Sequence, residues 1–343
     1  MEKTNYTQLY LKLTKGLSKK IRDIFDRRFG IKSGKTETLE SIGNSLGITR
    51  ERVRQIEEAG FNYIRKNHKE SLENIFGGFS SYFTSKGGFK REEVALGDLA
   101  DKKNKPYVLF LLTLGDSRFS RVAGKKDYHY FWLSHPASDK KIKETLFTLV
   151  KDIDSSKKLL TKDELFANFA SKYNLNSETA ISYLEISKKI QENKEGKIGL
   201  ISWPEIKPRG VRDKAFLVFK KEQKPLHFRK IAELIDSLGY SESDKKAHPQ
   251  TVHNELIKDT RFVLVGRGTY ALAEWGYFPG TIKDVITKVL KEKQEAVHQE
   301  DIVKEVLAQR LVAKNTVLIN LNNKKHFSKD TEGKYFLRET QTA

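Results

Sequence analysis

The chain contains no cysteine among its 343 residues. Disulfides, thiolate metal sites and thiol nucleophiles are therefore excluded together. Long hydrophobic runs are also missing, and no apolar stretch approaches the roughly 20 residues that a transmembrane helix needs. The N-terminal residues MEKTNYTQLYLKLTKG lack the apolar core of a secretory signal peptide. We therefore expect a cytoplasmic protein that has no membrane partner.

Signatures of catalysis and of metal binding are equally scarce. The eight histidines show no HExxH motif and no paired ligand spacing. The segment GIKSGKT, at residues 30–36, resembles a phosphate-binding loop, but it is one residue short of GxxxxGK[ST] and follows a predicted helix instead of a strand. We therefore expect no enzyme, no metal site, no cofactor and no small-molecule substrate.

Positive charge is what the chain has in excess. Its 64 Lys and Arg residues outnumber 45 Asp and Glu residues, which gives a formal net charge of +19. Such a balance attracts polyanions whatever the fold, and nucleic acid is the first candidate. The length also exceeds one compact core of ordinary size, so we expect two or more domains.

The most informative segment, TLESIGNSLGITRERVRQ, covers residues 38–55. Apolar residues recur at helical spacing in its first half: Leu39, Ile42 and Leu46. This spacing predicts the buried face of a first helix. Gly47 follows where the chain must turn, and Thr49 stands where a second helix needs an N-cap. Together these features predict a helix-turn-helix.

The second predicted helix has two distinct faces. One face is apolar or small and must pack inward: Val53, Ile56, Gly60 and Ile64. The other face is polar over the first two turns: Arg50, Glu51, Arg54 and Gln55. Those positions reach base edges when a recognition helix docks by its N-terminal end, where Arg can pair with guanine, Gln with adenine, and Glu can accept from cytosine. A solvated charged face is the alternative interpretation.

This segment resembles region 4 of the primary bacterial sigma factors, the module that reads the promoter −35 element. The resemblance rests on TLESIGNSLGITRERVRQIEEAG and on RRFGI upstream, and it covers residues 15–67. It implies double-stranded DNA and RNA polymerase as partners. No candidate for sigma region 2 accompanies it. The resemblance implies base contacts by Arg50, Glu51 and Gln55, and phosphate or base-edge contacts by Arg52 and Arg54.

Two further residues complete the predicted interface of this first domain. Thr49 opens the recognition helix. Lys35 lies in the linker before the helix-turn-helix, where the sigma-like interpretation brings it to a phosphate. The predicted DNA-binding set therefore extends from Lys35 to Gln55 in this part of the chain.

The remainder of the chain repeats itself. Three segments align in register on Thr179, Thr251 and Thr316, and each is followed at fixed offsets by a leucine and by further apolar residues. The last of these alternate, as Tyr270 and Leu272 do, which predicts a hairpin strand. Each segment follows further amphipathic helices, with predicted helix starts at Thr161, His227 and His298. Three helices and a hairpin in about 65 to 70 residues are typical of a winged helix.

The unit at residues 207–278 resembles the HARE-type winged helix-turn-helix, a family that includes the N-terminal domain of the RNA polymerase delta subunit. The resemblance rests on PLHFRKIAELI and TVHNELIKDTRFVLVGRGTYALAEWGY. Its turn GRGTY lacks a following helix, so a dinucleotide site is disfavoured. A wing tip that brings Arg267 to a phosphate or a minor groove is one interpretation, and a plain hairpin turn is the other.

A weaker fourth copy is predicted upstream of the three repeats. Phe89, Val94 and Leu99 are expected to serve its second helix, and residues 107–114 to form a third helix or a buried strand. Residues 119–133 are its expected wing. We predict a mainly α fold with small β-hairpins, built from tandem helix-turn-helix and winged-helix domains. The expected boundaries are 1–70, 71–136, 137–206, 207–278 and 279–343.

The leading hypothesis is a sequence-specific DNA-binding transcription factor, sigma-factor-like and located at the nucleoid. It would read promoter-type duplex DNA through residues 49–55 and associate with bacterial RNA polymerase. In the alternative, the protein binds DNA independently of RNA polymerase and is a repressor, a nucleoid protein or the DNA-recognition component of a defence system. A protein-interaction scaffold is a further possibility, because a winged-helix fold does not by itself fix function.

Overall fold

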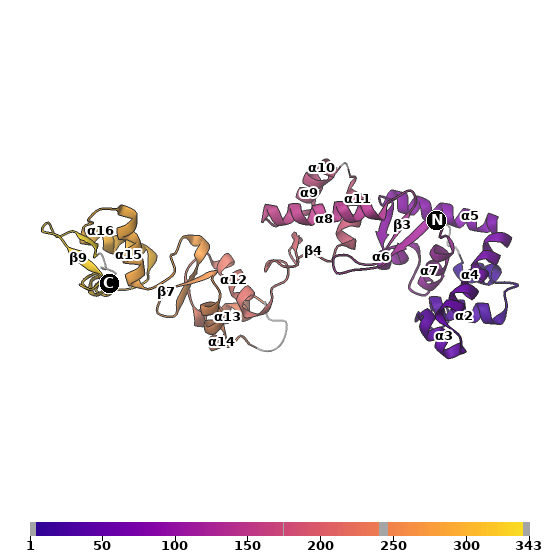
Figure 1. The fold of residues 1–343 in the computed structure, drawn as a ribbon, viewed down its shortest axis with the longest axis horizontal. Coiled ribbons are helices and arrows are strands. Elements are labelled where there is room, and N and C mark those ends of the chain that lie inside the picture. The colour runs from indigo at the N-terminus through magenta and orange to yellow at the C-terminus, as the bar shows by residue number, and fades with distance from the viewer. Residues whose placement is uncertain (1–4, 174, 240–245, 339–343) are drawn as a thin grey trace. The chain divides into compact units, whose positions relative to one another are not determined.

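A computed structural model describes residues 5–173, 175–239 and 246–338 (Figure 1). The contacts divide the chain into two units, Met1–Ser202 and Trp203–Ala343. Both are mainly helical with small antiparallel sheets, which confirms the predicted fold class. Among the described residues, no helix is both long enough and apolar enough to cross a membrane.

The first unit starts with a helical segment and continues through two winged helices. The helical segment comprises α1 (Tyr6–Leu13), α2 (Lys19–Phe29), α3 (Leu39–Leu46) and α4 (Arg50–Asn67). The first winged helix comprises α5 (Lys69–Ser85), β1 (Phe89–Arg91), α6 (Glu92–Leu99), α7 (Lys105–Leu114), β2 (Phe119–Val122) and β3 (Phe131–Ser134). The second comprises α8 (Asp139–Ser156), α9 (Lys162–Leu165), η1 (Phe166–Ala170), α10 (Ser171–Tyr173), α11 (Ser177–Ile186), β4 (Ile190–Glu192) and β5 (Ile198–Leu200).

The second unit contains two more winged helices. One comprises α12 (Gly210–Glu222), β6 (Leu226–His227), α13 (Phe228–Ser237), α14 (Pro249–Lys258), β7 (Phe262–Gly266), β8 (Thr269–Leu272) and η2 (Ala273–Trp275). The other comprises α15 (Ile282–Lys293), α16 (Gln299–Gln309), α17 (Lys314–Leu321), β9 (Phe327–Lys329) and β10 (Tyr335–Leu337).

All four copies share one topology of helix, short strand, two helices and hairpin. In two copies the short strand is β1 or β6, and the sheet orders are β1-β3-β2 and β6-β8-β7. In the other two it shrinks to a single antiparallel bridge, Leu160 with Ile198 and Val297 with Tyr335. This strand was not predicted from the sequence, because two or three residues carry no readable alternation.

The repeat positions fall where the sequence placed them. The threonine anchors lie in α11, α14 and α17, and the first hairpin strands begin at Ile190, Phe262 and Phe327. Residues 107–114 are helical, which resolves the choice between helix and buried strand. One expectation was wrong: Phe89 lies in β1 and pairs with Leu133, because it precedes the second helix of its copy.

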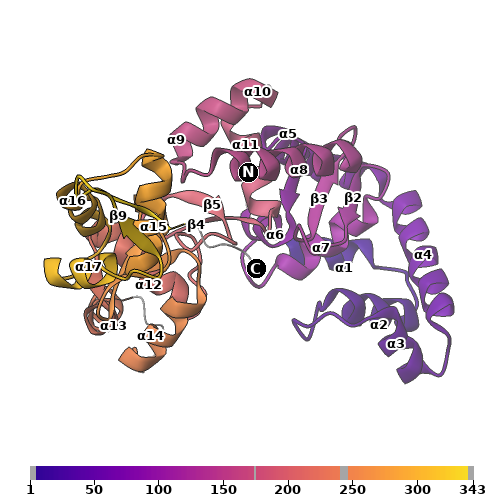
Figure 2. The same cartoon turned by 60° about the vertical axis from the view of Figure 1, so that its left-hand side comes forward.

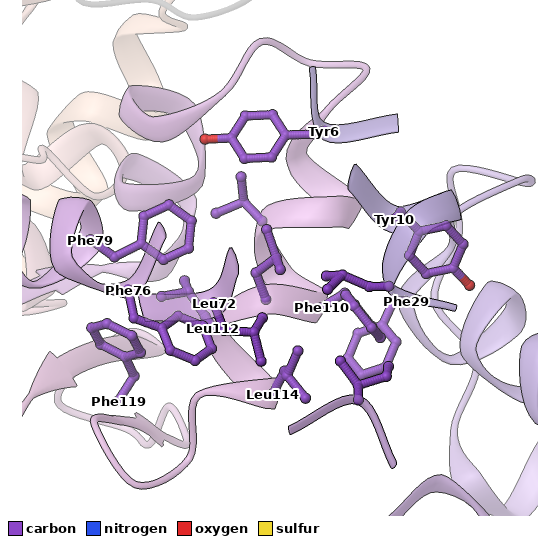
Figure 3. Packing of buried hydrophobic residues seen from close by; sticks show 14 of the residues in the cluster. Tyr6, Tyr10, Phe29, Leu72, Phe76, Phe79, Phe110, Leu112, Leu114 and Phe119 are labelled. Atoms are coloured by element: carbon purple, nitrogen blue, oxygen red, sulfur yellow. The ribbon is translucent and has the colours of Figure 1, made fainter. Parts of the chain in front are cut away.

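One hydrophobic core joins the helical segment to the first winged helix (Figure 3). The ring of Phe110 on α7 lies 5.2 Å from that of Phe25, 5.4 Å from that of Phe29 and 5.1 Å from that of Tyr10. Residues from both sides of position 70, where we predicted a domain boundary, therefore bury one another. In the second unit the two winged helices have separate main clusters, residues 215–272 and 285–335.

Candidate nucleic-acid interface

The helix α3 begins at a side-chain cap, and two glycines shape the turn that joins it to α4. Thr38 caps α3, because its hydroxyl accepts the Ser41 N–H at 3.1 Å. Gly47 ends α3 with φ of 65°, a conformation that costs glycine little. A Cβ on Gly43 would lie 2.6 Å from the Ile48 carbonyl oxygen, so only glycine allows the chain to fold back this closely. The predicted helix-turn-helix, formed by α3 and α4, is therefore confirmed. The preceding helix α2 lies beside α3 (Figure 2).

The helix α4 begins at its predicted cap and buries its predicted inner face. The Thr49 hydroxyl accepts the Arg52 N–H at 3.2 Å. Val53, Gly60 and Ile64 are buried, and Ile56 is half-buried. A Cβ on Gly60 would lie 2.7 Å from the Phe25 ring, so glycine permits the close approach of α2. This packing fixes the position of α4 and therefore of its first turn.

The outer face of the α4 N-terminus carries the predicted base-reading residues. All five side chains are exposed to solvent: Arg50, Glu51, Arg52, Arg54 and Gln55. Arg54 donates to both carboxylate oxygens of Glu51, at 2.7 and 3.0 Å, and Arg52 donates to the Gln55 side-chain oxygen at 3.1 Å. The Arg50 guanidinium makes no hydrogen bond or ion pair with any residue that the structure describes.

The electrostatics of this face favour an anionic ligand. The hydrogen bonds from Arg54 lower the pKa of the Glu51 carboxyl, and the same contact raises the pKa of Arg54. Glu51 therefore stays ionised at neutral pH. Residues 50–55 carry three guanidinium groups and one carboxylate, so this face is cationic and rich in hydrogen-bond donors.

A network of ion pairs sets the position of α3 against α2. Arg27 donates to both oxygens of Glu37, at 2.9 and 2.8 Å, and to the Ser45 hydroxyl at 2.9 Å. Such bidentate pairs fix geometry as well as contributing energy. The buried carboxylate of Asp26 accepts from the Tyr10 hydroxyl at 2.8 Å and pairs with Lys32 at 2.5 Å.

The remaining predicted contacts belong to other segments of the chain. Lys35 is exposed in the loop between α2 and α3, and its ammonium has no partner among the described residues. Arg267 is exposed at the tip of the β7–β8 hairpin, beside Gly268 with φ of 68°, in the second unit. The structure thus gathers residues 49–55 on one helix, and Lys35 and Arg267 belong to other segments. No group of three His, Asp or Glu side chains within the described ranges is placed to hold a metal ion.

The third helices of the four winged helices differ in what covers them, a feature that our sequence analysis did not predict. No residue of α7 is exposed, and Ser177 is the only exposed residue of α11. Glu178 and Glu185 on α11 pair with Lys86 and Lys90 at 2.6 and 2.9 Å. These two helices are therefore occupied by packing within the first unit.

The corresponding helices of the second unit present an outward face. Exposed residues of α14 are Gln250, Thr251, Asn254, Ile257 and Lys258, and those of α17 are Lys314, Asn315, Thr316 and Ile319. A signal was available for α7, since YVLFLLTL is apolar on every side and predicts full burial. No comparable signal marked α11.

Comparison with known proteins assigns the same two segments. Residues 15–66 match the family described as sigma-70, region 4. Residues 210–275 match the HARE-HTH family, whose description includes the restriction endonuclease HTH domain. In the first segment, the chain is 38% identical over 61 residues to the RNA polymerase sigma factor SigA of Nostoc sp., a match that covers 18% of this chain and 16% of that protein.

Two other relatives align over similarly short stretches. Identity is 39% over 56 residues with the sigma factor SigA1 of Synechococcus elongatus, covering 16% of this chain and 14% of the relative. It is 39% over 61 residues with the sigma factor sigB of Arabidopsis thaliana, covering 17% and 11%. The likeness to sigma factors is thus confined to a small part of both chains. The protein contains a sigma-70 region 4 domain and a HARE-type helix-turn-helix domain, both of the DNA-binding helix-turn-helix class.

Proposed function

We propose that this protein is a sequence-specific DNA-binding transcription factor that reads promoter-type duplex DNA through the N-terminus of α4 and associates with bacterial RNA polymerase. The observation that carries the proposal is the exposed, cationic N-terminus of α4, whose opposite face is buried against the rest of the domain. A recognition helix must project from a rigid domain, because its first turns enter the major groove. Val53, Gly60 and Ile64 hold α4 from behind, while Arg50 to Gln55 stay accessible.

The roles that we assign follow from the side-chain chemistry. Arg50, which lacks a described partner, is placed to donate to the two acceptors of a guanine edge. Glu51 and Gln55 supply an acceptor for cytosine and a donor–acceptor pair for adenine. Their present partners, Arg54 and Arg52, then turn toward phosphates. Lys35 and Arg267 add phosphate contacts, which position a protein on duplex DNA without specifying the sequence.

The test of base reading is Arg50→Ala. We expect relaxed preference at one base pair of a selected site, at a cost of about 1–3 kcal/mol in binding free energy. Arg22→Ala removes an exposed guanidinium on α2 and is the matched control. Binding-site selection on random duplexes, followed by titration of the selected site, measures both. An Arg50→Ala profile identical to that of the unaltered protein would refute the assignment.

The polymerase association needs its own experiment. We expect tagged full-length protein to retain RNA polymerase from a bacterial lysate after nuclease treatment, so that shared DNA does not bridge the two. Reconstitution with purified polymerase provides the direct check, and the same pull-down with the tag alone is the negative control. Absence of binding in both formats would rule out this part of the proposal.

A second candidate function is a DNA reader that works without polymerase. The confinement of the sigma-like match to 16% of one relative and 14% of another favours it, because the rest of those proteins has no counterpart in the alignment. Sequence-selective binding without polymerase retention would support this alternative.

A further inference from the structure

The C-terminal winged helix carries an unusual distribution of charge. Between Leu311 and Lys329 there is no aspartate or glutamate, whereas lysine occurs at positions 314, 324, 325 and 329. This stretch contains the whole of α17, which is labelled in Figure 2. Neither family match reaches it, since the second one ends at residue 275.

The outward face of α17 has the chemistry of a groove-reading surface. Lys314, Asn315 and Thr316 are exposed in its first turn, and Val317 and Leu321 are buried beneath. Ile319 is 72% exposed, and an apolar side chain in this position is able to contact a thymine methyl group. The equivalent helix α11 carries Glu178 and Glu185, which pair with lysines of the first winged helix. The same topological position therefore serves packing in one copy and faces solvent in the other.

A cationic hollow follows α17 directly in the chain. It has a volume of about 470 Å³ and no carboxylate among its lining residues, which are Leu321, Asn322, Lys324, Phe327, Ser328, Lys329, Tyr335 and Arg338. Arg338 donates to the Lys324 carbonyl at 3.0 Å, and the Tyr335 hydroxyl donates to Asn322 at 3.0 Å. The Lys329 ammonium lies 5.5 Å from the centre of the Tyr335 ring. Among the described residues, Lys324, Lys329 and Arg338 form no ion pair, so the positive charge of the hollow is not compensated.

We propose that the C-terminal winged helix is a second duplex-DNA site, in which α17 faces a groove and Lys324, Lys329 and Arg338 hold a backbone phosphate. Uncompensated cations around a hollow match a phosphate, and amide and hydroxyl groups on α17 match base edges and sugars. An acidic protein segment would satisfy the cations, but it leaves the polar first turn of α17 without a complementary surface. The site goes beyond the reading helix α4 and does not depend on it.

The charge-reversal test uses the full chain with Lys324→Glu and Lys329→Glu together. Each phosphate contact contributes about 0.9 to the slope of log K against log salt concentration. Because these cations hold one phosphate, we expect the slope to decrease in magnitude by about 0.9, on promoter-type and mixed-sequence duplexes alike. Lys291→Glu with Lys293→Glu is the matched control, because these lysines of α15 are exposed and lie outside the acid-free stretch. An unchanged slope, or an equal loss in the control, would overturn the proposal.

The absence of cysteine permits a second, structural readout. Asn315→Cys introduces a single thiol on the first turn of α17, to which a DNA-cleaving iron chelate can be attached. We expect strand cleavage clustered within one groove, and Lys291→Cys is expected to give none. Cleavage by both or by neither would contradict the assignment. Capture of an acidic protein by the hollow, with DNA binding unaffected by charge reversal, would also overturn it.

The two proposals fail in different ways. If α4 does not read bases, Arg50→Ala leaves sequence preference unchanged while Lys324→Glu with Lys329→Glu still lowers the salt slope. If α17 does not bind DNA, the salt slope is unchanged while Arg50→Ala still alters base preference. Measuring both variants on the same duplexes separates these outcomes.

Discussion

The winged helices of the first unit and those of the second have the same topology but use their third helices differently. In the first unit α7 lies in the shared core, and α11 packs on the first winged helix through two ion pairs. In the second unit α14 and α17 leave amide, hydroxyl and cationic groups in solvent. Topology alone therefore does not tell which winged helix is able to reach a groove, because a recognition surface also has to be uncovered.

The difference has a physical basis in the side chains of each helix. In α7, apolar residues occur on every side of the helix. Packing of one face against its own winged helix therefore leaves further apolar surface, which only contact with a second segment removes from water. The helical segment α1–α4 supplies that partner, and its aromatic rings surround Phe110. We infer that the first winged helix is a platform that fixes α4, whereas the second unit keeps its third helices accessible.

The largest expected effect comes from breaking that platform. Phe110→Ala leaves a cavity among Tyr10, Phe25 and Phe29 and should lower the free energy of unfolding by about 3–5 kcal/mol. The paired change Ile319→Ala on the exposed face of α17 should alter it by no more than about 0.5 kcal/mol. Urea unfolding of the full-length variants, followed by circular dichroism, measures both. Similar losses in the two variants would show that α7 and α17 are equally buried, contrary to the comparison.

A smaller effect is expected where α11 meets the first winged helix. The Lys90 side chain is 4% exposed and lies 2.9 Å from the Glu185 carboxylate, whose side chain is 24% exposed. Lys90→Met leaves that carboxylate without its cation and should lower the free energy of unfolding of the unit by about 2 kcal/mol. This loss is smaller than that expected on breaking a fully buried ion pair, because solvent still reaches Glu185.

Hydrogen exchange separates this local effect from general unfolding. In Lys90→Met, the amides of α11 should exchange faster than those of α3, and Lys103→Met, at an exposed position, should change neither. Uniform acceleration across the first unit would argue against a local contact between α11 and β1.

The smallest expected effect concerns α4, the one reading helix that we assign to the first unit. Burial raises the pKa of Glu57 on its inner face, although Arg28 at 3.7 Å opposes the shift. A carboxyl whose pKa is higher folded than unfolded binds more protons in the folded state. Its contribution to stability is therefore greatest below the unfolded pKa of about 4.3 and falls as pH rises through the folded pKa.

The variant Glu57→Gln should remove this dependence. Its unfolding free energy should decline less than that of the unaltered protein as pH increases from the unfolded pKa toward neutrality. Glu51→Gln provides the opposite sign, because Arg54 lowers the pKa of Glu51. Parallel pH profiles for all three proteins would show that neither carboxyl contributes.

Much of the local structure could be predicted because its signals lie close together in the chain. Thr49 was expected to cap α4, Gly47 to end α3, and Val53 and Ile64 to face inward, and the structure confirms each. The register of the three repeats followed from their apolar spacing in the same way. The predicted DNA contacts of Arg50, Glu51 and Gln55 stay predictions, with their exposure established.

The sequence by itself determined the helix-turn-helix of residues 38–55 and the repeated unit of helices and hairpin, since caps and apolar periods act within a few residues. Only the tertiary structure decided that one core crosses position 70, that Phe89 belongs to a strand, and that α7 and α11 are covered while α14 and α17 are not. Those outcomes depend on contacts between segments far apart in the chain, such as Phe25 with Phe110 and Lys90 with Glu185. No spacing rule within one segment encodes such contacts, because they arise only when the packed surfaces meet.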